Sequence, residues 1–190
     1  DLAWLGLRPD GILVQSDRRP AHQAALQRLA DMGLAYPCFC TRADIAAAAQ
    51  APHGAQSPYP GTCRTLDPEQ AAARAATEPH AIRLNAAAAA ARTGPLQWLE
   101  AETPTPADPT IAGDVVLARK DIGVGYMLAA VVDDAHQGIT DIVRGRDLLE
   151  ATPTQRLLQV LLGLPSPRTH HHRLLLAPDG RRLAKRDQAA

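Results

Sequence analysis

Three cysteines are spaced so that they could bind one metal ion. Cys38 and Cys40 form a C-x-C pair, and Cys63 follows a loop rich in proline and glycine. Zinc takes four ligands, most often cysteine and histidine. The fourth ligand could be His53 or Tyr59, although a tyrosine phenolate is an unusual zinc ligand. The alternative is that the cysteines are small buried core residues, because free cysteine is often buried.

An arginine lies where a predicted strand ends and a helix begins. The alternating β-branched run 139–143 predicts the strand, and leucines at helical spacing follow it as far as Gly163. Because α/β folds bind ligands at the carboxyl ends of strands, Arg144 is a candidate for gripping a carboxylate or phosphate. The local pattern fits a solvated loop arginine equally well.

The end of the chain is basic. The segment RRLAKR at 181–186 follows a Pro-Asp-Gly turn and could place Lys185 against a phosphate, where cations stabilise a leaving pyrophosphate. A solvated basic tail is the alternative. Three histidines at 170–172 do not predict a metal site, because neighbouring side chains on a strand point to opposite faces.

Two further features lie in the apolar stretch that begins at Gly125. Tyr126 lies at the start of a predicted helix, where a lone aromatic residue is more often part of the core than of a ligand site. Asp133 and Asp134 could be an acid/base pair. Capping or bridging of backbone groups at a helix end is the favoured interpretation.

Composition limits the class of protein. A chain of 190 residues can hold one good-sized core, or one domain with a smaller insertion. Lys+Arg and Asp+Glu both total 20, so no overall charge attracts nucleic acid or membrane. No apolar run reaches transmembrane length, and an odd number of cysteines without a secretory signal favours a cytoplasmic enzyme. Both ends look cut, so we expect a part of a larger protein.

The remaining pattern predicts alternating helices and strands. Helices are expected at 20–32, 43–50, 67–77 and from about 148 to 162. Strands are expected at 12–14, 35–40, 80–84, 114–118, 139–143 and 174–176. Residues 86–112 contain a helix-capable alanine run and then a Thr/Pro-rich stretch, which predicts a linker or surface loop.

Taken together, six short motifs resemble the catalytic core of the glutamyl-tRNA synthetases. They are QSDR at 15–18, CFCTR at 38–42, YPGTCR at 59–64, Tyr126 followed by AAVVDD, GITDIVRGRDLL at 138–149 and RRLAKR at 181–186. The set is most similar to the shortened paralogues of that family, the glutamyl-queuosine tRNA(Asp) synthetases. The resemblance covers the chain apart from residues 86–112.

The resemblance implies an α/β class I synthetase fold. A Rossmann-type parallel sheet, with its N-terminal part missing, would be interrupted by a small zinc-bearing insertion. Residues 1–34 and 113–168 would form the catalytic domain, 35–112 the insertion, and 169–190 the region of the ATP-binding loop.

The resemblance also implies the site residues. One structural zinc would be held by Cys38, Cys40, Tyr59 and Cys63, which favours Tyr59 over His53. Glutamate would contact Tyr126 and Arg144. ATP would be bound by the KMSKS-like segment, in which Lys185 is the catalytic lysine: Arg182, Leu183, Ala184, Lys185 and Arg186.

The implied reaction uses ATP with Mg²⁺ to activate glutamate and transfers it to the queuosine base in the anticodon of tRNA(Asp). A cytoplasmic monomer that does not associate with membranes is expected. Two alternatives remain: the catalytic core of an ordinary glutamyl-tRNA synthetase, and a non-catalytic zinc-bearing module that binds RNA.

The sequence departs from the family pattern in three places. The family's N-terminal segment with its HIGH signature is absent from this chain. Met127 replaces a residue that is often polar, and Arg182 and Ala184 replace the first lysine and the serine of KMSKS. The chain alone is therefore expected to be incomplete for activity.

Overall fold

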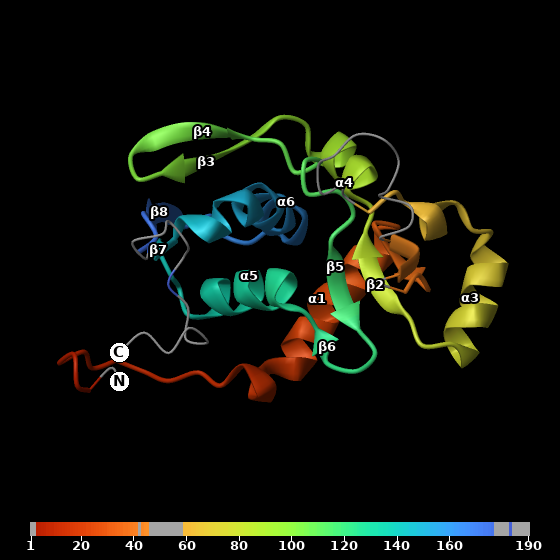
Figure 1. Cartoon of the computed structure of the whole chain (residues 1–190), viewed down its shortest axis with the longest axis horizontal. Coiled ribbons are helices and arrows are strands. Elements are labelled where there is room, and N and C mark those ends of the chain that lie inside the picture. Colours follow the sequence, from red (N-terminus) through yellow and green to blue (C-terminus); the bar gives the residue numbers. More distant parts are fainter. Residues whose placement is uncertain (1–2, 42, 46–58, 177–182, 184–190) are drawn as a thin grey trace.

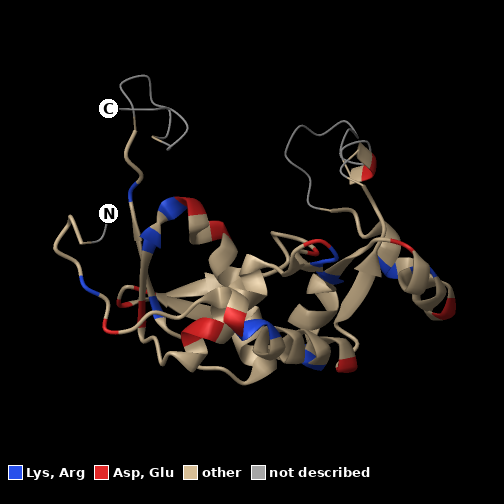
Figure 2. Cartoon of the chain, turned by 90° about the horizontal axis from the view of Figure 1, so that it is seen from below, with Lys and Arg blue, Asp and Glu red and all other residues tan. Residues whose placement is uncertain are grey.

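The computed structural model describes residues 3–41, 43–45, 59–176 and 183. Within these ranges the chain forms two four-stranded sheets with helices packed between and beside them (Figure 1). Basic and acidic residues are interspersed over the elements, as expected from their equal totals (Figure 2). None of the helices in these ranges has the length and apolarity needed to cross a membrane.

The first sheet is antiparallel and has the strand order β1-β2-β5-β6. Its strands are β1 (Ala35–Cys38), β2 (Ala81–Leu84), β5 (Val116–Arg119) and β6 (Gly123–Val124). Helix α1 (Arg19–Asp31) precedes β1, and α3 (Pro68–Thr77) and α4 (Ala86–Thr93) flank β2 in the sequence. A 3-10 turn at Thr62–Thr65 carries the third cysteine.

The second sheet contains the parallel strands. Its order is β4-β3-β8-β7, formed by β3 (Leu96–Glu100), β4 (Thr103–Ala107), β7 (Asp141–Gly145) and β8 (Arg168–His172). β8 is parallel to both β7 and β3, whereas β3 and β4 form an antiparallel hairpin. The register pairs Arg144 with His171 across β7 and β8, so these two side chains start from the same row of the sheet.

The core lies between the sheets, where α1, α5 (Tyr126–His136) and α6 (Thr152–Leu162) pack together (Figure 1). Fully buried leucines come from the first sheet and all three helices: Leu29, Leu84, Leu117, Leu128, Leu157 and Leu158. Such closely packed apolar contacts hold α5 and α6 against the sheets. These two helices flank β7 in the sequence and lie beside it in the fold, so their side chains surround the end of this strand.

Several predicted elements are confirmed, and three predictions are wrong. The strand expected at 12–14 is irregular chain, and the last regular strand among the described residues is β8 at 168–172 rather than 174–176. The Thr/Pro-rich stretch is not a loop but strand β4 of a hairpin. Pro104 and Pro106 are tolerated because β4 is an edge strand. Backbone nitrogens two residues apart point to the same side of a strand, so the nitrogens of both prolines can point away from β3, where no hydrogen bond is needed.

Candidate functional site

The three cysteines lie together at the end of β1. Their sulfur atoms are all within 4.8 Å of one another, and the Sγ atoms of Cys40 and Cys63 are 3.5 Å apart. A tetrahedral zinc ion with Zn–S bonds of about 2.3 Å would place its sulfur ligands about 3.8 Å apart. Cys38 and Cys63 are buried, and all three are free thiols. The cluster could therefore hold a metal ion, and His53, the other candidate ligand, lies outside the described residues.

Tyr59 stands beside this cluster. Its hydroxyl oxygen lies 3.5 Å from Cys40 Sγ and accepts a hydrogen bond of 2.8 Å from the Cys63 backbone N–H. The Arg83 guanidinium lies 3.9 Å from the centre of the Tyr59 ring, so a cation–π contact fixes the ring plane. Burial raises the pKa of Tyr59, so its deprotonation as a ligand would be coupled to binding of the ion.

The thiols of the cluster differ in acidity. Burial raises the pKa of Cys40 to about 11, and its contact with Tyr59 opposes this only in part. Burial acts in the same direction on Cys63, but hydrogen bonds from the Tyr59 hydroxyl and the Phe39 backbone N–H bring its pKa below the usual value. Because metals bind the thiolate, Cys63 is the cysteine best prepared to receive one.

A buried carboxylate ties the two cysteine segments together. Asp114 is 3% exposed and accepts hydrogen bonds from Tyr36 Oη (2.5 Å), Arg64 Nη1 (3.0 Å) and the Ala86 backbone N–H (2.9 Å). Tyr36 precedes Cys38 by two residues, and Arg64 directly follows Cys63. Asp114 was not predicted from the sequence. The only feature that marks it there is its position as a lone acidic residue directly before an apolar strand.

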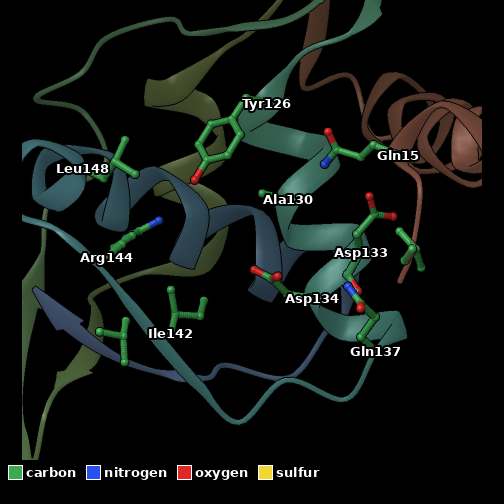
Figure 3. A pocket seen from close by; sticks show the side chains of 11 residues that line it. Gln15, Tyr126, Ala130, Asp133, Asp134, Gln137, Ile142, Arg144 and Leu148 are labelled. Carbon is green, nitrogen blue, oxygen red and sulfur yellow. Dashed lines mark hydrogen bonds between the residues drawn. The ribbon is translucent and has the colours of Figure 1, made fainter. Parts of the chain in front are cut away.

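A second candidate site surrounds Arg144. A cavity of about 520 Å³ opens between α5 and β7, and Tyr126, Asp134 and Arg144 line it together with Gln15 and Asp133. Figure 3 shows Tyr126 and Arg144 toward one side of this cavity and the two aspartates toward the other. Tyr126 is 51% exposed and so belongs to the cavity wall rather than to the core.

Arg144 is held by three neutral acceptors. Its Nε donates to His171 Nε2 (2.9 Å), Nη1 to Gln155 Oε1 (2.7 Å) and Nη2 to Thr152 Oγ1 (2.9 Å). No carboxylate among the described residues lies within 4.0 Å of its guanidinium nitrogens. A half-buried cation at a strand end without an anionic partner is suited to an anionic ligand.

The two aspartates have different surroundings. The interpretation of Asp133 as a backbone cap is wrong: it is 4% exposed within α5, and its Oδ1 bonds His22 Nε2 (2.9 Å) and Arg18 Nε (3.4 Å). Because Asp133 points inward from the helix, its polar partners are His22 of α1 and Arg18, which directly precedes α1. Asp134 faces the cavity, where burial raises the pKa of its carboxyl although the charge of Arg144 acts to lower it.

The three histidines do not converge on one point. His170 bonds Asp141 (3.2 Å), His171 bonds Arg144 and Glu100, and His172 bonds the Arg173 carbonyl (2.9 Å). Glu100 was not predicted from the sequence. It is partly buried, and burial alone would raise its pKa. Hydrogen bonds from the His171 N–H, Thr169 and the His171 ring outweigh this and bring that pKa to about 2. No short motif marks Glu100, because its role depends on strand pairing.

The KMSKS-like segment is largely beyond what the structure describes. Leu183 alone is placed, and its backbone N–H donates to the Leu175 carbonyl (3.1 Å). The other predicted ATP-binding residues lie outside the described residues: Arg182, Ala184, Lys185 and Arg186.

Comparison with curated proteins gives relatives that match almost the whole chain. Glutamyl-Q tRNA(Asp) synthetases of Nocardia farcinica, Rhodobacter capsulatus and Symbiobacterium thermophilum are 48%, 46% and 44% identical to it. Each alignment covers 100% of this chain. The chain spans 59%, 72% and 61% of the length of these relatives.

Solved structures share the fold. A glutamate tRNA ligase from Elizabethkingia meningosepticum, in complex with its amino acid, superposes with a TM-score of 0.73 at 22% identity. The match covers 98% of this chain and 40% of that one. A glutamate-tRNA synthetase from Elizabethkingia anophelis gives a TM-score of 0.74 over 98% of this chain and 41% of its own. Residues 1–190 match the family described as tRNA synthetases class I (E and Q), catalytic domain, and the chain belongs to that family.

Proposed function

We propose that the complete protein activates glutamate with ATP and transfers the glutamyl group to the queuosine base of tRNA(Asp). The observation that carries this proposal is the Arg144 cation, which faces a cavity at the end of a parallel strand without an anionic partner among the described residues. An amino acid with a side-chain carboxylate supplies that partner. The names of the relatives, glutamyl-Q tRNA(Asp) synthetases, supply the acceptor.

In this proposal Arg144 and Tyr126 hold the glutamate side chain across the cavity. The α-carboxylate attacks the α-phosphorus of ATP in line, and pyrophosphate leaves. No protein nucleophile is needed, because positioning and cations provide the acceleration. Mg²⁺ accompanies ATP, and Lys185 in the 182–186 segment stabilises the charge that develops on pyrophosphate. The resemblance of that segment to KMSKS supports this role.

We infer that the ion at the cysteine cluster is one zinc, held by Cys38, Cys40, Cys63 and Tyr59. The softness of three thiolates and the distances between the sulfur atoms support zinc. Four protein ligands leave no open position for water or substrate, so its role is structural. The ion would join the end of β1 to the Thr62–Thr65 turn.

We also infer that residues 35–112 are an insertion within a Rossmann-type catalytic domain made by 1–34 and 113–168, followed by the ATP-binding loop region 169–190. The insertion would not be an independent body, because β3 extends the sheet of β7 and β8. We also propose a monomer in the cytoplasm, on the resemblance to the synthetases alone.

The test is glutamate-dependent exchange of pyrophosphate into ATP by the complete protein. Glutamate should support exchange, while glutamine and aspartate should support it at least tenfold less well, because only glutamate places a carboxylate at the distance set by Arg144. Replacement of Arg144 by alanine should abolish the preference. Arg146→Ala is the matched control, since Arg146 is an exposed arginine that directly follows β7. Exchange with glutamine equal to that with glutamate would contradict the proposal.

A further inference from the structure

The guanidinium of Arg144 has a fixed orientation. Of its five N–H groups, three donate to acceptors on α6 and β8, and two remain, one on each terminal nitrogen. Gln155 and Thr152 come from α6, while His171 comes from the strand paired with β7. The three acceptors prevent rotation of the guanidinium about its stem. A fork with two free N–H groups is suited to one carboxylate.

The acceptor role of His171 requires one protonation state. Its Nε2 accepts from Arg144 Nε at 2.9 Å, so Nε2 carries no proton. Its Nδ1 lies 2.8 Å from Glu100 Oε2 and donates to it. The His171 side chain is 2% exposed, so water does not compete for either nitrogen. Both hydrogen bonds therefore demand a neutral imidazole with its proton on Nδ1.

Glu100 is itself fixed by its surroundings. One oxygen accepts the His171 backbone N–H at 2.8 Å, and the other accepts Thr169 Oγ1 at 2.7 Å and Trp98 Nε1 at 3.3 Å. With these donors on both oxygens, Glu100 is held as an acceptor for the imidazole. The chain of contacts runs from β3 through β8 to β7, across the parallel part of the sheet (Figure 1).

We propose that Glu100 and His171 are positioning residues that orient Arg144 toward the substrate carboxylate. The proposal rests on the proposed function and adds the source of its geometry. Glu100 selects the imidazole tautomer, and the imidazole aligns the guanidinium without neutralising it. A carboxylate directly on Arg144 would compete with the substrate, whereas a neutral imidazole keeps the cation available. The middle histidine of the 170–172 run thus acts through an arginine and not as a metal ligand.

A purely structural role for these contacts, joining α6 to the sheet, makes a different prediction. Loss of a structural tie would affect the Michaelis constants for ATP and glutamate together, or the stability of the fold. Loss of a positioning contact would affect glutamate alone. The ratio of the two Michaelis constants therefore separates the two roles.

The kinetic test uses the complete protein and four variants in the pyrophosphate exchange assay. His171→Leu should raise the KM for glutamate between about tenfold and about a hundredfold, and that for ATP less than twofold. His171→Gln, which keeps an acceptor, should recover part of the loss. Glu100→Gln should resemble His171→Leu. Both oxygens of Glu100 accept hydrogen bonds, so in either orientation the amide NH₂ group of glutamine would face a donor and lose a contact. His172→Leu is the matched control: the same change at the next, exposed position of β8 should leave both constants unchanged.

A second measurement reads the tautomer without any activity. Multiple-bond ¹H–¹⁵N spectra of the protein with ¹⁵N-labelled histidine distinguish a proton on Nδ1 from one on Nε2, and the signal that disappears in His171→Gln identifies the residue. We expect the Nδ1–H form in the wild type and its loss in Glu100→Gln. A proton on Nε2 in the wild type would overturn the proposal.

The outcomes separate the two proposals. If the wild type does not exchange pyrophosphate with glutamate, the proposed function fails, and with it the role of Glu100 and His171 in positioning Arg144 toward the substrate. If the wild type is active but His171→Leu changes both Michaelis constants equally or neither, the proposed function stands and the positioning inference is wrong. A selective rise in the glutamate constant together with the Nδ1–H tautomer supports it.

Discussion

Removal of the Asp114 carboxylate should destabilise the cysteine cluster and the fold together. In Asp114→Ala the Ala86 N–H and the Tyr36 hydroxyl lose their acceptor in a site that is 3% exposed. A buried polar group left without a partner costs about 1–3 kcal/mol. The third donor, Arg64, is 37% exposed and can turn to water, so its loss adds little.

The two buried groups together cost about 2–6 kcal/mol, which includes the range of about 3–5 kcal/mol for breaking a buried charged contact by removing one partner. The assay is urea denaturation of the complete protein with zinc present, analysed at constant m-value. Asp121→Ala is the control: its ion pair with Arg119 is short, 2.6 Å, but Asp121 is 58% exposed. We expect the control to cost less than about 1 kcal/mol.

The same variant should release its metal faster, because Asp114 holds segments on both sides of the cluster. A chromophoric chelator mixed with the metal-loaded protein measures that rate, and Asp121→Ala again provides the reference. A loss of stability no larger than that of the control, with unchanged metal release, would refute the view that Asp114 supports the cysteine segments.

Three further predictions concern the metal, the substrate and pH. Metal analysis should find one zinc per chain, reduced strongly by Cys63→Ser; protein purified with zinc and reductant that contains none would contradict the assignment. Arg144→Ala should raise the KM for glutamate by about tenfold to a hundredfold, the equivalent of a lost charged hydrogen bond, while ATP dependence is unchanged; an unchanged glutamate dependence would make Arg144 a structural residue. The pKa of Glu100, about 2 against an ordinary 4.5, means that its stabilisation is complete above pH 4.5 and is lost as the pH falls toward 2. In urea denaturation the free energy of unfolding of Glu100→Gln should therefore be about 1–2 kcal/mol below that of the wild type at pH 7, and this difference should shrink between pH 4.5 and 3. A difference that grows in that range would contradict the lowered pKa of Glu100.

Local patterns predicted much of the fold correctly. The leucine spacing of α6, the apolar spacing of α1 and the composition of α3 are properties of consecutive residues, and the structure confirms these helices. The hairpin β3–β4 could not be predicted in this way, because prolines are unfavourable in a strand unless it lies at an edge, and edge position depends on the whole sheet. Strand β8 was misplaced because its histidines are polar and the leucines after it are not.

The candidate site was predicted only in part. The C-x-C pair and Cys63 were recognised because their spacing is a local signal, and they lie together in the structure. Asp114 and Glu100 form hydrogen bonds with residues far away in the sequence. A single carboxylate belongs to no spacing pattern, so the sequence does not show which residues it contacts. Residues that bind directly are marked by type and motif, whereas the residues that support them are set by strand pairing and burial.

Transfer of labelled glutamate by the complete protein with ATP tests the proposed function most directly. Three acceptors are compared: tRNA(Asp) that carries queuosine, tRNA(Asp) that lacks it, and tRNA(Glu). An unstacked anticodon base can enter an enzyme cavity at modest cost, so the nucleoside itself can be the acceptor. We expect label on the queuosine-bearing tRNA(Asp) alone, whereas label at the 3′ end of tRNA(Glu) would contradict transfer to queuosine.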